Sequence, residues 1–474
     1  MYDHIILISI DTLRSDGIAC NPFRLWPEEY GLSYDLRTPL LDELVRTGAF
    51  FANTITAAPY TSASHASLLT GMWPPNHGAY EFLGQPLSVP TIFTEAKRRS
   101  YHTILKTDFP VMLGKHLGFD RGVDQYFVED DDAFVAAVSG ANRSCSLLHF
   151  GSVHIPYGFH SMRFGGQDYV DKVEALESEL GQGSSSAPAD VLSETYRSTE
   201  DLELLMRYKR IVVALYAERQ YDKLFKLYLE GIEHFCRTRF ELVLNRLREA
   251  TAHSKTLFVL FGDHGEAYNA ETYGHFNSID EGVLRVPLLF WGDQIKPGMF
   301  TSRVRTVDLV PTLCELLEWN VATSFDGASL VEALREGREP TPRRAYSQVF
   351  VAQAQQAFRA QRQFCSDSEM EPVQHVLYKE AVYDGPYKLS RRNYVAGTEN
   401  RNPVPCTPEV QLEHFDTALR PHSAWDESVV ESLQTAMNDY GGNQPSSGLT
   451  IPAELRRHLE NHGYLQKHGG QTEN

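Results

Sequence analysis

The chain has 474 residues, of which 42% are hydrophobic and 22% are charged. This is the composition of an ordinary globular protein, so collagen, a coiled coil and wholesale disorder are excluded. The formal net charge is −18, whereas general nucleic-acid and anionic-membrane binders usually carry a positive excess. We therefore expect neither nucleic acid nor a membrane as a partner, and the composition leaves the oligomeric state open.

The cysteines and the first residues predict a cytoplasmic protein. The segment Met1–His4 has no basic stretch, and the apolar run 5–10 is too short for an export signal or a membrane span. No cysteine belongs to a CxxC pair, which predicts reduced thiols and neither a disulfide framework nor a zinc ribbon. The six cysteines are Cys20, Cys145, Cys236, Cys314, Cys365 and Cys406.

Apolar runs alternate with helical patterns along most of the chain. The run 5–10 predicts a buried parallel strand. A helix is expected next, with Thr38 as N-cap, Pro39 at its first position and Gly48 at its end. The alternation predicts an α/β fold with a mainly parallel sheet and helices on both faces. Further strands are predicted at 49–53, 101–105, 146–150, 256–261 and 286–290, and a helix at 240–250.

The pattern changes near residue 340. Residues 1–340 are predicted to form the main domain, with an insertion at about 160–215. Two strand-like segments follow, at 344–350 and 376–382, with a spacing that suits a small antiparallel sheet. Residues 341–474 are therefore predicted to form a smaller C-terminal α+β subdomain with a polar tail.

Metal-binding side chains follow two of the predicted strands. Asp11 comes directly after the first strand, and Asp263 and His264 follow the strand 256–261. Open α/β sheets bind ligands at the carboxyl ends of their strands, and these side chains are ligands for divalent cations. For Asp11 alone, a helix cap or a loop acid is the favoured interpretation, whereas packing does not readily explain an adjacent Asp-His pair.

Small hydroxyl residues open an Ala/Leu-rich helix at Thr61 and Ser62. A hydroxyl at the amino end of a helix can meet an anionic ester where the helix dipole favours negative charge. For this segment alone, a simple N-cap is the more economical interpretation. His154 follows the predicted strand 146–150, and it fits a structural or a functional histidine equally well.

Together these motifs resemble the sulfatase branch of the alkaline phosphatase superfamily over about residues 1–335. The family signature Cys/Ser-x-Pro-Ser-Arg-x-x-Leu-Leu-Thr-Gly is similar to Thr61–Gly71, and Pro-x-x-His-Gly is matched at 74–78. His275 lies where the family often has His-Gly-Asn-Ser. Asp11 and the pair Asp263-His264 match the metal-binding residues, and 285–288, 307–313 and 326–330 also recur in the family.

The signature departs from the family at three positions. Thr61 replaces the Cys or Ser that sulfatases convert to formylglycine, and Ala63 and His65 replace Pro and Arg. Threonine is not converted, so no formylglycine is expected, and a charge-assisted contact of the Arg is missing. Superfamily members with Thr here include phosphodiesterases, phosphonate hydrolases and glycerophosphate-transferring polymerases. The resemblance therefore implies a phosphoric or phosphonic ester in preference to a sulfuric ester.

The resemblance implies a metal-activated threonine nucleophile. One divalent ion (Mn²⁺, Ca²⁺, Mg²⁺ or Zn²⁺) would lie between Asp11, Asp263, His264 and the hydroxyl of Thr61. The substrate would be a small anionic ester, cleaved by hydrolysis. Two alternatives stay open: a transferase that uses the same Thr61 intermediate, and a relative that binds an anion without turning it over.

Four further side chains are assigned catalytic roles by the resemblance. His154 and His275 would assist the leaving group or a non-bridging oxygen. His65 would stand near the nucleophile where the family has Arg. Lys106 matches the family lysine, and Lys115 is the rival candidate for that role.

Overall fold

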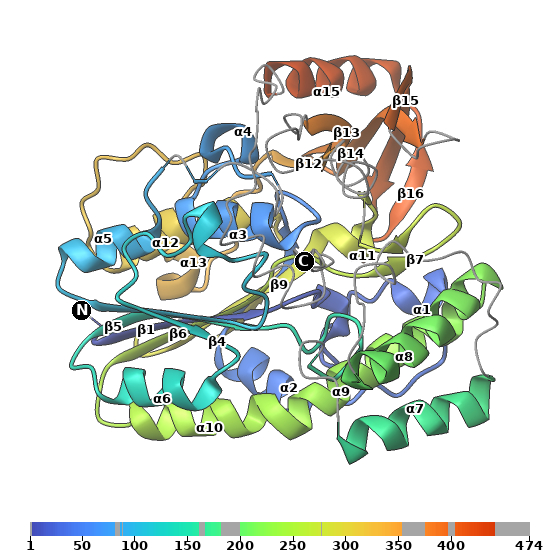
Figure 1. Cartoon of the computed structure of the whole chain (residues 1–474). Coiled ribbons are helices and arrows are strands. Elements are labelled where there is room, and N and C mark those ends of the chain that lie inside the picture. The colour runs from blue at the N-terminus through green and yellow to red at the C-terminus, as the bar shows by residue number, and fades with distance from the viewer. Residues whose placement is uncertain are drawn as a thin grey trace, which may run out of the picture.

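The computed structural model describes residues 2–80, 86–87, 89–160, 166–181, 200–275, 277–352, 375–396 and 403–440. A central sheet runs through the main domain (Figure 1). Its strand order is β10-β2-β9-β6-β1-β5-β3-β4, with β11 beside β2. Only β9 runs antiparallel to its neighbours among these strands, which confirms the mainly parallel α/β fold. The strands are β1 (His4–Ile10), β2 (Ala49–Ile55), β3 (His102–Thr107), β4 (Gln125–Val128), β5 (Ser144–Phe150), β6 (Thr256–Gly262), β9 (Arg285–Gly292), β10 (Gly298–Phe300) and β11 (Val304–Arg305).

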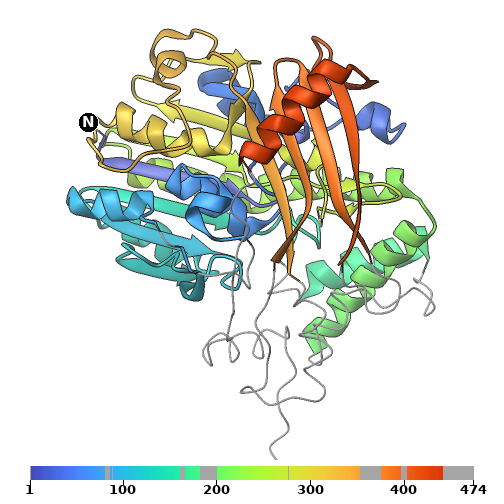
Figure 2. The same cartoon turned by 90° about the horizontal axis from the view of Figure 1, so that it is seen from above.

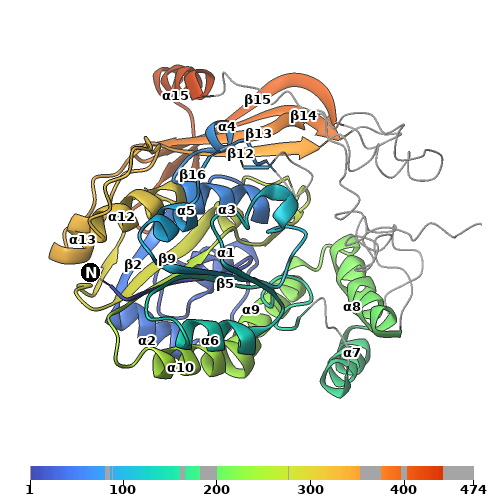
Figure 3. The ribbon, with the colours of Figure 1, turned by 60° about the vertical axis from the view of Figure 1, so that its left-hand side comes forward.

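Strand β1 explains why helices cover both faces of the sheet. All seven of its residues are buried, and successive side chains of a strand point to opposite faces. Ile6 and Ile8 belong to one apolar core, with α2 (Pro39–Thr47), α6 (Asp131–Ser139), α9 (Tyr221–Phe235) and α10 (Glu241–Ala250). Ile5 and Leu7 belong to the other core, with α3 (Thr61–Thr70), α5 (Ile92–Arg98), α12 (Leu309–Leu316) and α13 (Val331–Glu336). Figure 3 shows the sheet between these two layers.

The predicted elements of the main sheet are confirmed to within two residues at each end. The predicted helix begins at Pro39, after the N-cap residue Thr38, and ends before Gly48. The side chain of Thr38 does not cap it, because its Oγ1 accepts the amide N–H of Ala19 at 2.7 Å. Within the predicted insertion lie α7 (Gln167–Leu180) and most of α8 (Glu200–Ala217), which stand together beside the main layers (Figure 3).

A second, antiparallel sheet follows the first, as predicted. Its order is β12-β13-β14-β15-β16, and the predicted strands 344–350 and 376–382 are its first two members. The helix α15 (Glu427–Tyr440) lies across this sheet (Figure 2). Its Leu433 and Met437 share an apolar cluster with Val382 and Leu389. The strands are β12 (Ala345–Ala352), β13 (His375–Asp384), β14 (Tyr387–Ala396), β15 (Pro403–Phe415) and β16 (Pro421–Ala424). In the described part of the chain, no helix is both long and apolar enough to cross a membrane.

Candidate active site

The carboxyl ends of two neighbouring strands bring three side chains together. Asp11 follows β1 and Asp263 follows β6, and the two strands pair in register with Ile10 opposite Gly262. Asp11, Asp263 and His264 are all fully buried. One ligand atom from each of the three can be chosen so that the atoms lie within 4.8 Å of one another. We call these three residues and Thr61 the catalytic cluster.

Each carboxylate of the catalytic cluster has one oxygen with protein donors and one without. Asp11 Oδ2 lies 3.2 Å from the donor Thr61 Oγ1 and 3.2 Å from His149 Nε2. Asp263 Oδ1 accepts the amide N–H of His264 at 2.9 Å. Asp11 Oδ1 and Asp263 Oδ2 are buried without a hydrogen-bond partner. Unpaired buried carboxylate oxygens are costly unless a cation compensates them.

The tautomer of His264 completes this donor set. Its Nδ1 lies 3.2 Å from the carbonyl oxygen of Gly265, which only accepts, so Nδ1 carries the proton. Nε2 therefore holds a lone pair, at 3.7 Å from Asp11 Oδ1 and 3.5 Å from Asp263 Oδ2. Two unpaired carboxylate oxygens and one imidazole nitrogen are ligands that divalent metals accept. The residues present therefore fit a divalent cation.

Thr61 is the first residue of α3, and its hydroxyl belongs to the catalytic cluster. Its Oγ1 lies 3.4 Å from His264 Nε2, and the residue is 7% exposed. The N-cap residue is Tyr60, and no side chain caps the helix. The interpretation of Thr61 or Ser62 as a simple cap is therefore wrong. Both hydroxyls point elsewhere, since that of Ser62 donates to the carbonyl of Met112 at 2.6 Å.

His65 lies one helical turn after Thr61 on α3, next to Asp263. Its Nδ1 lies 2.8 Å from the carbonyl oxygen of Thr61 and therefore carries the proton, so Nε2 accepts from Ser9 Oγ at 2.8 Å. Burial lowers the pKa of His65 to about 4. Because the ring is neutral at neutral pH, His65 does not replace the charge of the family's Arg. It instead supports the backbone of Thr61, at 3.6 Å from Asp263 Oδ2.

His154 and His275 extend the cluster as a row of imidazole rings. The ring centroid of His275 lies 4.2 Å from that of His264 and 5.3 Å from that of His154. Burial lowers the pKa of His154, and it lowers that of His275 well below the usual range. His154 Nδ1 lies 3.0 Å from the carbonyl of Ile155, which places the proton of the neutral ring on that nitrogen. Both predicted histidines therefore lie on the His264 side of the cluster.

The two candidate lysines lie in different surroundings. Lys106 is fully buried, and its ammonium forms ion pairs with Asp108 and with Asp131, the latter at 2.8 Å. The same nitrogen donates to the carbonyl of His149 at 3.1 Å. Lys115 is exposed, and its ammonium lies 5.5 Å from the ring centroid of Tyr126. Lys106 therefore contacts the backbone of His149, and its charge is paired with Asp108 and Asp131.

His149 is the residue of this site that the sequence motifs did not single out. It lies on β5 opposite Ser9 of β1, and its side chain is fully buried. Asp11 only accepts, so Nε2 of His149 carries the proton and Nδ1 accepts from Thr107 Oγ1 at 3.2 Å. Burial lowers its pKa to about 4. The sequence does not reveal this role of His149, because a histidine inside an apolar run contacts Asp11 only when β1 and β5 pair in this register.

Comparison with known proteins shows which family the residues of this site resemble. The family model described as "Sulfatase" matches residues 3–134 and 240–319, which contain Asp11, Thr61 and the pair Asp263-His264. Over these residues the chain is similar to the sulfatase-like branch of the alkaline phosphatase superfamily. This similarity supports a hydrolase that acts on ester bonds.

Two curated relatives differ in the reaction that their names give. Choline-sulfatase of Rhizobium meliloti (strain 1021) is 23% identical, over 97% of this chain and 96% of the relative. The low-salt glycan biosynthesis sulfotransferase Agl7 of Haloferax volcanii is 23% identical, over 59% of this chain and 58% of the relative. A sulfatase and a sulfotransferase thus both occur among the relatives of this chain.

Solved structures share the fold over nearly the whole chain. BT4656 in complex with its substrate D-glucosamine-2-N,6-O-disulfate superposes with a TM-score of 0.62 at 14% identity, covering 94% of this chain and 99% of that one. The phosphonate monoester hydrolase SpPMH of Silicibacter pomeroyi gives a TM-score of 0.54 at 16% identity, covering 95% and 98%. At these identities the likeness concerns the fold, which carries both sulfatases and a phosphonate hydrolase.

Proposed function

We propose that this protein is a sulfatase-like hydrolase that cleaves a small phosphoric or phosphonic ester, with Thr61 as nucleophile and one divalent metal ion bound by Asp11, Asp263 and His264. One observation carries the proposal. The hydroxyl of Thr61 stands 3.2 Å from Asp11 and 3.4 Å from His264, beside two carboxylate oxygens that lack partners. A divalent ion bound there would lower the pKa of a nearby hydroxyl and offset the negative charge of the ester.

The protein's own residues prepare the nucleophile. Asp11 Oδ2 accepts the hydroxyl hydrogen of Thr61, and His149 holds the same oxygen from the other side. His65 bonds to the carbonyl of Thr61 and so fixes the first turn of α3. The hydroxyl is thereby held in one orientation before a substrate arrives, which is how positioning lowers the entropic part of a reaction barrier.

The reaction proceeds in two displacements. Thr61 Oγ1 loses its proton and forms a bond to phosphorus while the bond from phosphorus to the ester's alcohol oxygen breaks, and the departing oxygen takes up one proton and leaves as the alcohol. The amino end of α3, whose dipole favours negative charge, faces the group being transferred. His154 and His275 assist the departing oxygen. Water then attacks phosphorus, releases the phosphate or phosphonate and restores the threonine hydroxyl. Lys106 acts through the carbonyl of His149, as a positioning residue.

The choice of ester rests on Thr61. Threonine does not form formylglycine, whereas a phospho-threonine is an ordinary ester that water can hydrolyse. A sulfuric ester is the second candidate, because choline-sulfatase is a relative over 97% of this chain. Transfer to an alcohol is the third, since a sulfotransferase is also related. A protein that binds an anion without reaction would have no need of the nucleophile geometry at Thr61.

A substrate panel tests the proposal. Aryl phosphate monoesters and diesters, phosphonates and sulfates are each assayed with Mn²⁺, Ca²⁺, Mg²⁺ and Zn²⁺. We expect fastest turnover of a phosphorus ester, loss of turnover in Thr61→Ala, and turnover near the wild-type rate in Ser62→Ala. The latter is the matched control, because it removes the neighbouring hydroxyl, which bonds to Met112.

Each other result has a distinct meaning. Wild-type turnover by Thr61→Ala would refute the nucleophile. A sulfate ester as the best substrate would refute the ester class and leave the nucleophile standing. Accumulation of a phosphorylated alcohol when an acceptor is added would identify a transferase. The absence of turnover on every ester would favour the non-catalytic alternative.

A further inference from the structure

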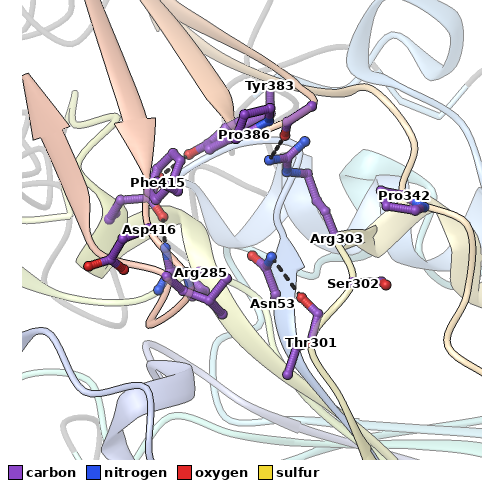
Figure 4. Close-up of a pocket in the computed structure, with 13 residues that line it drawn as sticks. Asn53, Arg285, Thr301, Ser302, Arg303, Pro342, Tyr383, Pro386, Phe415 and Asp416 are labelled. Carbon is purple, nitrogen blue, oxygen red and sulfur yellow. Dashed lines mark hydrogen bonds and ion pairs between the residues drawn. The ribbon is translucent and has the colours of Figure 1, made fainter. Parts of the chain in front are cut away.

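A cavity lies between the central sheet and the C-terminal sheet. It has a volume of about 230 Å³, and its lining residues are drawn in Figure 4. Asn53 of β2 and Arg285 of β9 come from the central sheet, and Arg303 comes from the segment between β10 and β11. Tyr383 of β13 and Phe415 of β15 come from the C-terminal sheet. We call this cavity the arginine pocket, and it shares no residue with the catalytic cluster.

Arg303 carries a buried charge with little compensation. The residue is 7% exposed, and its Nη2 donates to the carbonyl of Gly385 at 2.7 Å. Its Nε and Nη1 are buried without a hydrogen-bond partner. Among the described residues, no carboxylate forms an ion pair with it. The guanidinium carbon lies 5.3 Å from the ring centroid of Tyr383, a contact that leaves the in-plane N–H groups unused.

Arg285 offers further unused donors to the same cavity. It is 4% exposed, and its Nη2 forms an ion pair with Glu281 Oε2 at 2.7 Å. Its Nε and Nη1 are also buried without a partner. Glu281 does not serve Arg285 alone, because Lys388 lies 3.2 Å from its other oxygen and Tyr383 donates to it as well.

The buried charges around the pocket leave a positive excess. The buried cations are Arg285, Arg303 and Lys388, and the buried acid that pairs with them is Glu281. The partly exposed Glu413 lies 3.3 Å from Lys388. The remaining acid of the lining is Asp416. Its carboxylate accepts the amide N–H groups of Ala418 and Arg420 and lies 3.1 Å from His422 Nε2, so its own turn satisfies it.

We propose that the arginine pocket binds a small oxyanion of the size of sulfate or phosphate. Guanidinium N–H groups match the paired oxygens of such anions, and burial strengthens the attraction. The volume of about 230 Å³ exceeds the roughly 30 Å³ that one water occupies in the liquid, so an anion and accompanying waters fit. Because the walls come from both sheets, the bound anion joins the C-terminal sheet to the main domain. The inference does not depend on the reaction proposed for Thr61.

Titration calorimetry on the full-length protein in EDTA tests the proposal. Without a cation the catalytic cluster is negative and repels anions, so binding reports on the pocket. Sodium sulfate and sodium phosphate are compared with sodium chloride at equal ionic strength. We expect both oxyanions to bind, and Arg303→Gln to weaken the affinity at least about tenfold. Arg344→Gln is the matched control, because it removes an exposed arginine just before β12, which pairs with Asp384 and does not line the pocket.

The proposal is overturned if the wild type binds neither oxyanion, or if the wild type and Arg303→Gln bind with equal affinity. If Arg303→Gln does not fold, Arg303→Lys provides the comparison, because it keeps the charge and loses the planar fork. A crystal soaked in selenate gives a second readout. Anomalous density beside Arg303 supports the site, and water alone in the cavity refutes it. Neither result depends on whether Thr61 is the nucleophile.

Discussion

The catalytic cluster and the arginine pocket are both buried, and both hold polar atoms that the protein leaves without partners. In the cluster these atoms are carboxylate oxygens of Asp11 and Asp263, and in the pocket they are guanidinium nitrogens of Arg285 and Arg303. Since each unpaired buried charge costs folding free energy, a protein retains it where a ligand compensates it. The opposite signs indicate opposite ligands, a cation in the cluster and an oxyanion in the pocket.

The surroundings of Lys106 show that burial alone is not the signal. Lys106 is as buried as Asp11, but its ammonium has Asp108 and Asp131 as partners. Arg239 joins the same two acids, at 2.7 Å from Asp108 and 2.8 Å from Asp131. The ammonium of Lys106 is therefore paired within the protein and has no donor left for a ligand. The unpaired atoms distinguish a binding site from a structural ion pair.

The largest effect is expected from removing a carboxylate of the cluster. Asp11→Asn should lower turnover at least about a thousandfold and abolish stoichiometric metal binding, measured by steady-state assay and inductively coupled plasma mass spectrometry. In EDTA the same variant should melt at a higher temperature than the wild type, because it removes the repulsion between Asp11 and Asp263. Asp35→Asn, at an exposed position, should behave like the wild type. Full metal occupancy in Asp11→Asn would refute the ligand assignment.

Removing the acid beside the arginine pocket should destabilise the fold. Glu281→Gln leaves Arg285 and Lys388 without their buried partner, and we expect a loss of about 3 kcal/mol in the free energy of unfolding. Urea denaturation at neutral pH measures it. A loss below the error of the measurement would show that Glu281 does not balance these cations.

The same residue predicts a pH dependence. Burial alone would raise the pKa of Glu281, but Lys388 and Arg285 outweigh it and lower the pKa from 4.5 to about 2. A depressed folded-state pKa contributes stability that is present above pH 4.5 and is lost as the pH falls towards 2. The wild type should therefore lose stability more steeply than Glu281→Gln over this interval. Parallel curves would contradict the prediction.

A smaller loss of metal affinity is expected when the contact that orients Asp11 is removed. His149→Ala removes the N–H that holds Asp11 Oδ2, and loss of such a supporting contact typically weakens metal affinity about 10-fold to 100-fold. Competition with a fluorescent chelator measures the change. His149→Gln keeps an N–H donor and should recover part of the affinity. Equal affinities in all three proteins would show that His149 does not orient Asp11.

The two candidate lysines give the last contrast. Lys115→Ala should change neither turnover nor stability beyond about 0.5 kcal/mol, because the residue is exposed. Lys106→Met should destabilise the protein, since it leaves Asp108 and Asp131 facing each other with one cation fewer. Substrate KM measured on the folded fraction of Lys106→Met should stay near the wild-type value. A large loss of turnover in Lys115→Ala would reverse the assignment.

The sequence predicted the parts of the site that follow strand ends. Asp11 and Asp263 come directly after apolar runs, and the carboxyl ends of parallel strands meet at one edge, so their approach followed from the pattern. The contact of His149 with Asp11 could not be predicted in this way, because it depends on the register of β5 against β1.

Two other features lay beyond the sequence pattern for related reasons. Whether Thr61 caps α3 or faces Asp11 depends on where the helix begins, and a shift of one residue decides it. The arginine pocket depends on how the second sheet packs against the first. Arg303 meets Tyr383 and Gly385 across about 80 residues of chain, and neither charge nor periodicity gives a signal for that contact.

The most direct test of the central claim is to trap the group on Thr61. The metal-loaded protein is mixed with its best phosphorus ester, quenched in acid within one turnover and digested for mass spectrometry. The account predicts a peptide containing Thr61 that carries one added phospho group, which Thr61→Ala lacks and Thr61→Ser retains on the serine. A phospho group on another residue, or turnover by Thr61→Ala at the wild-type rate, would contradict it.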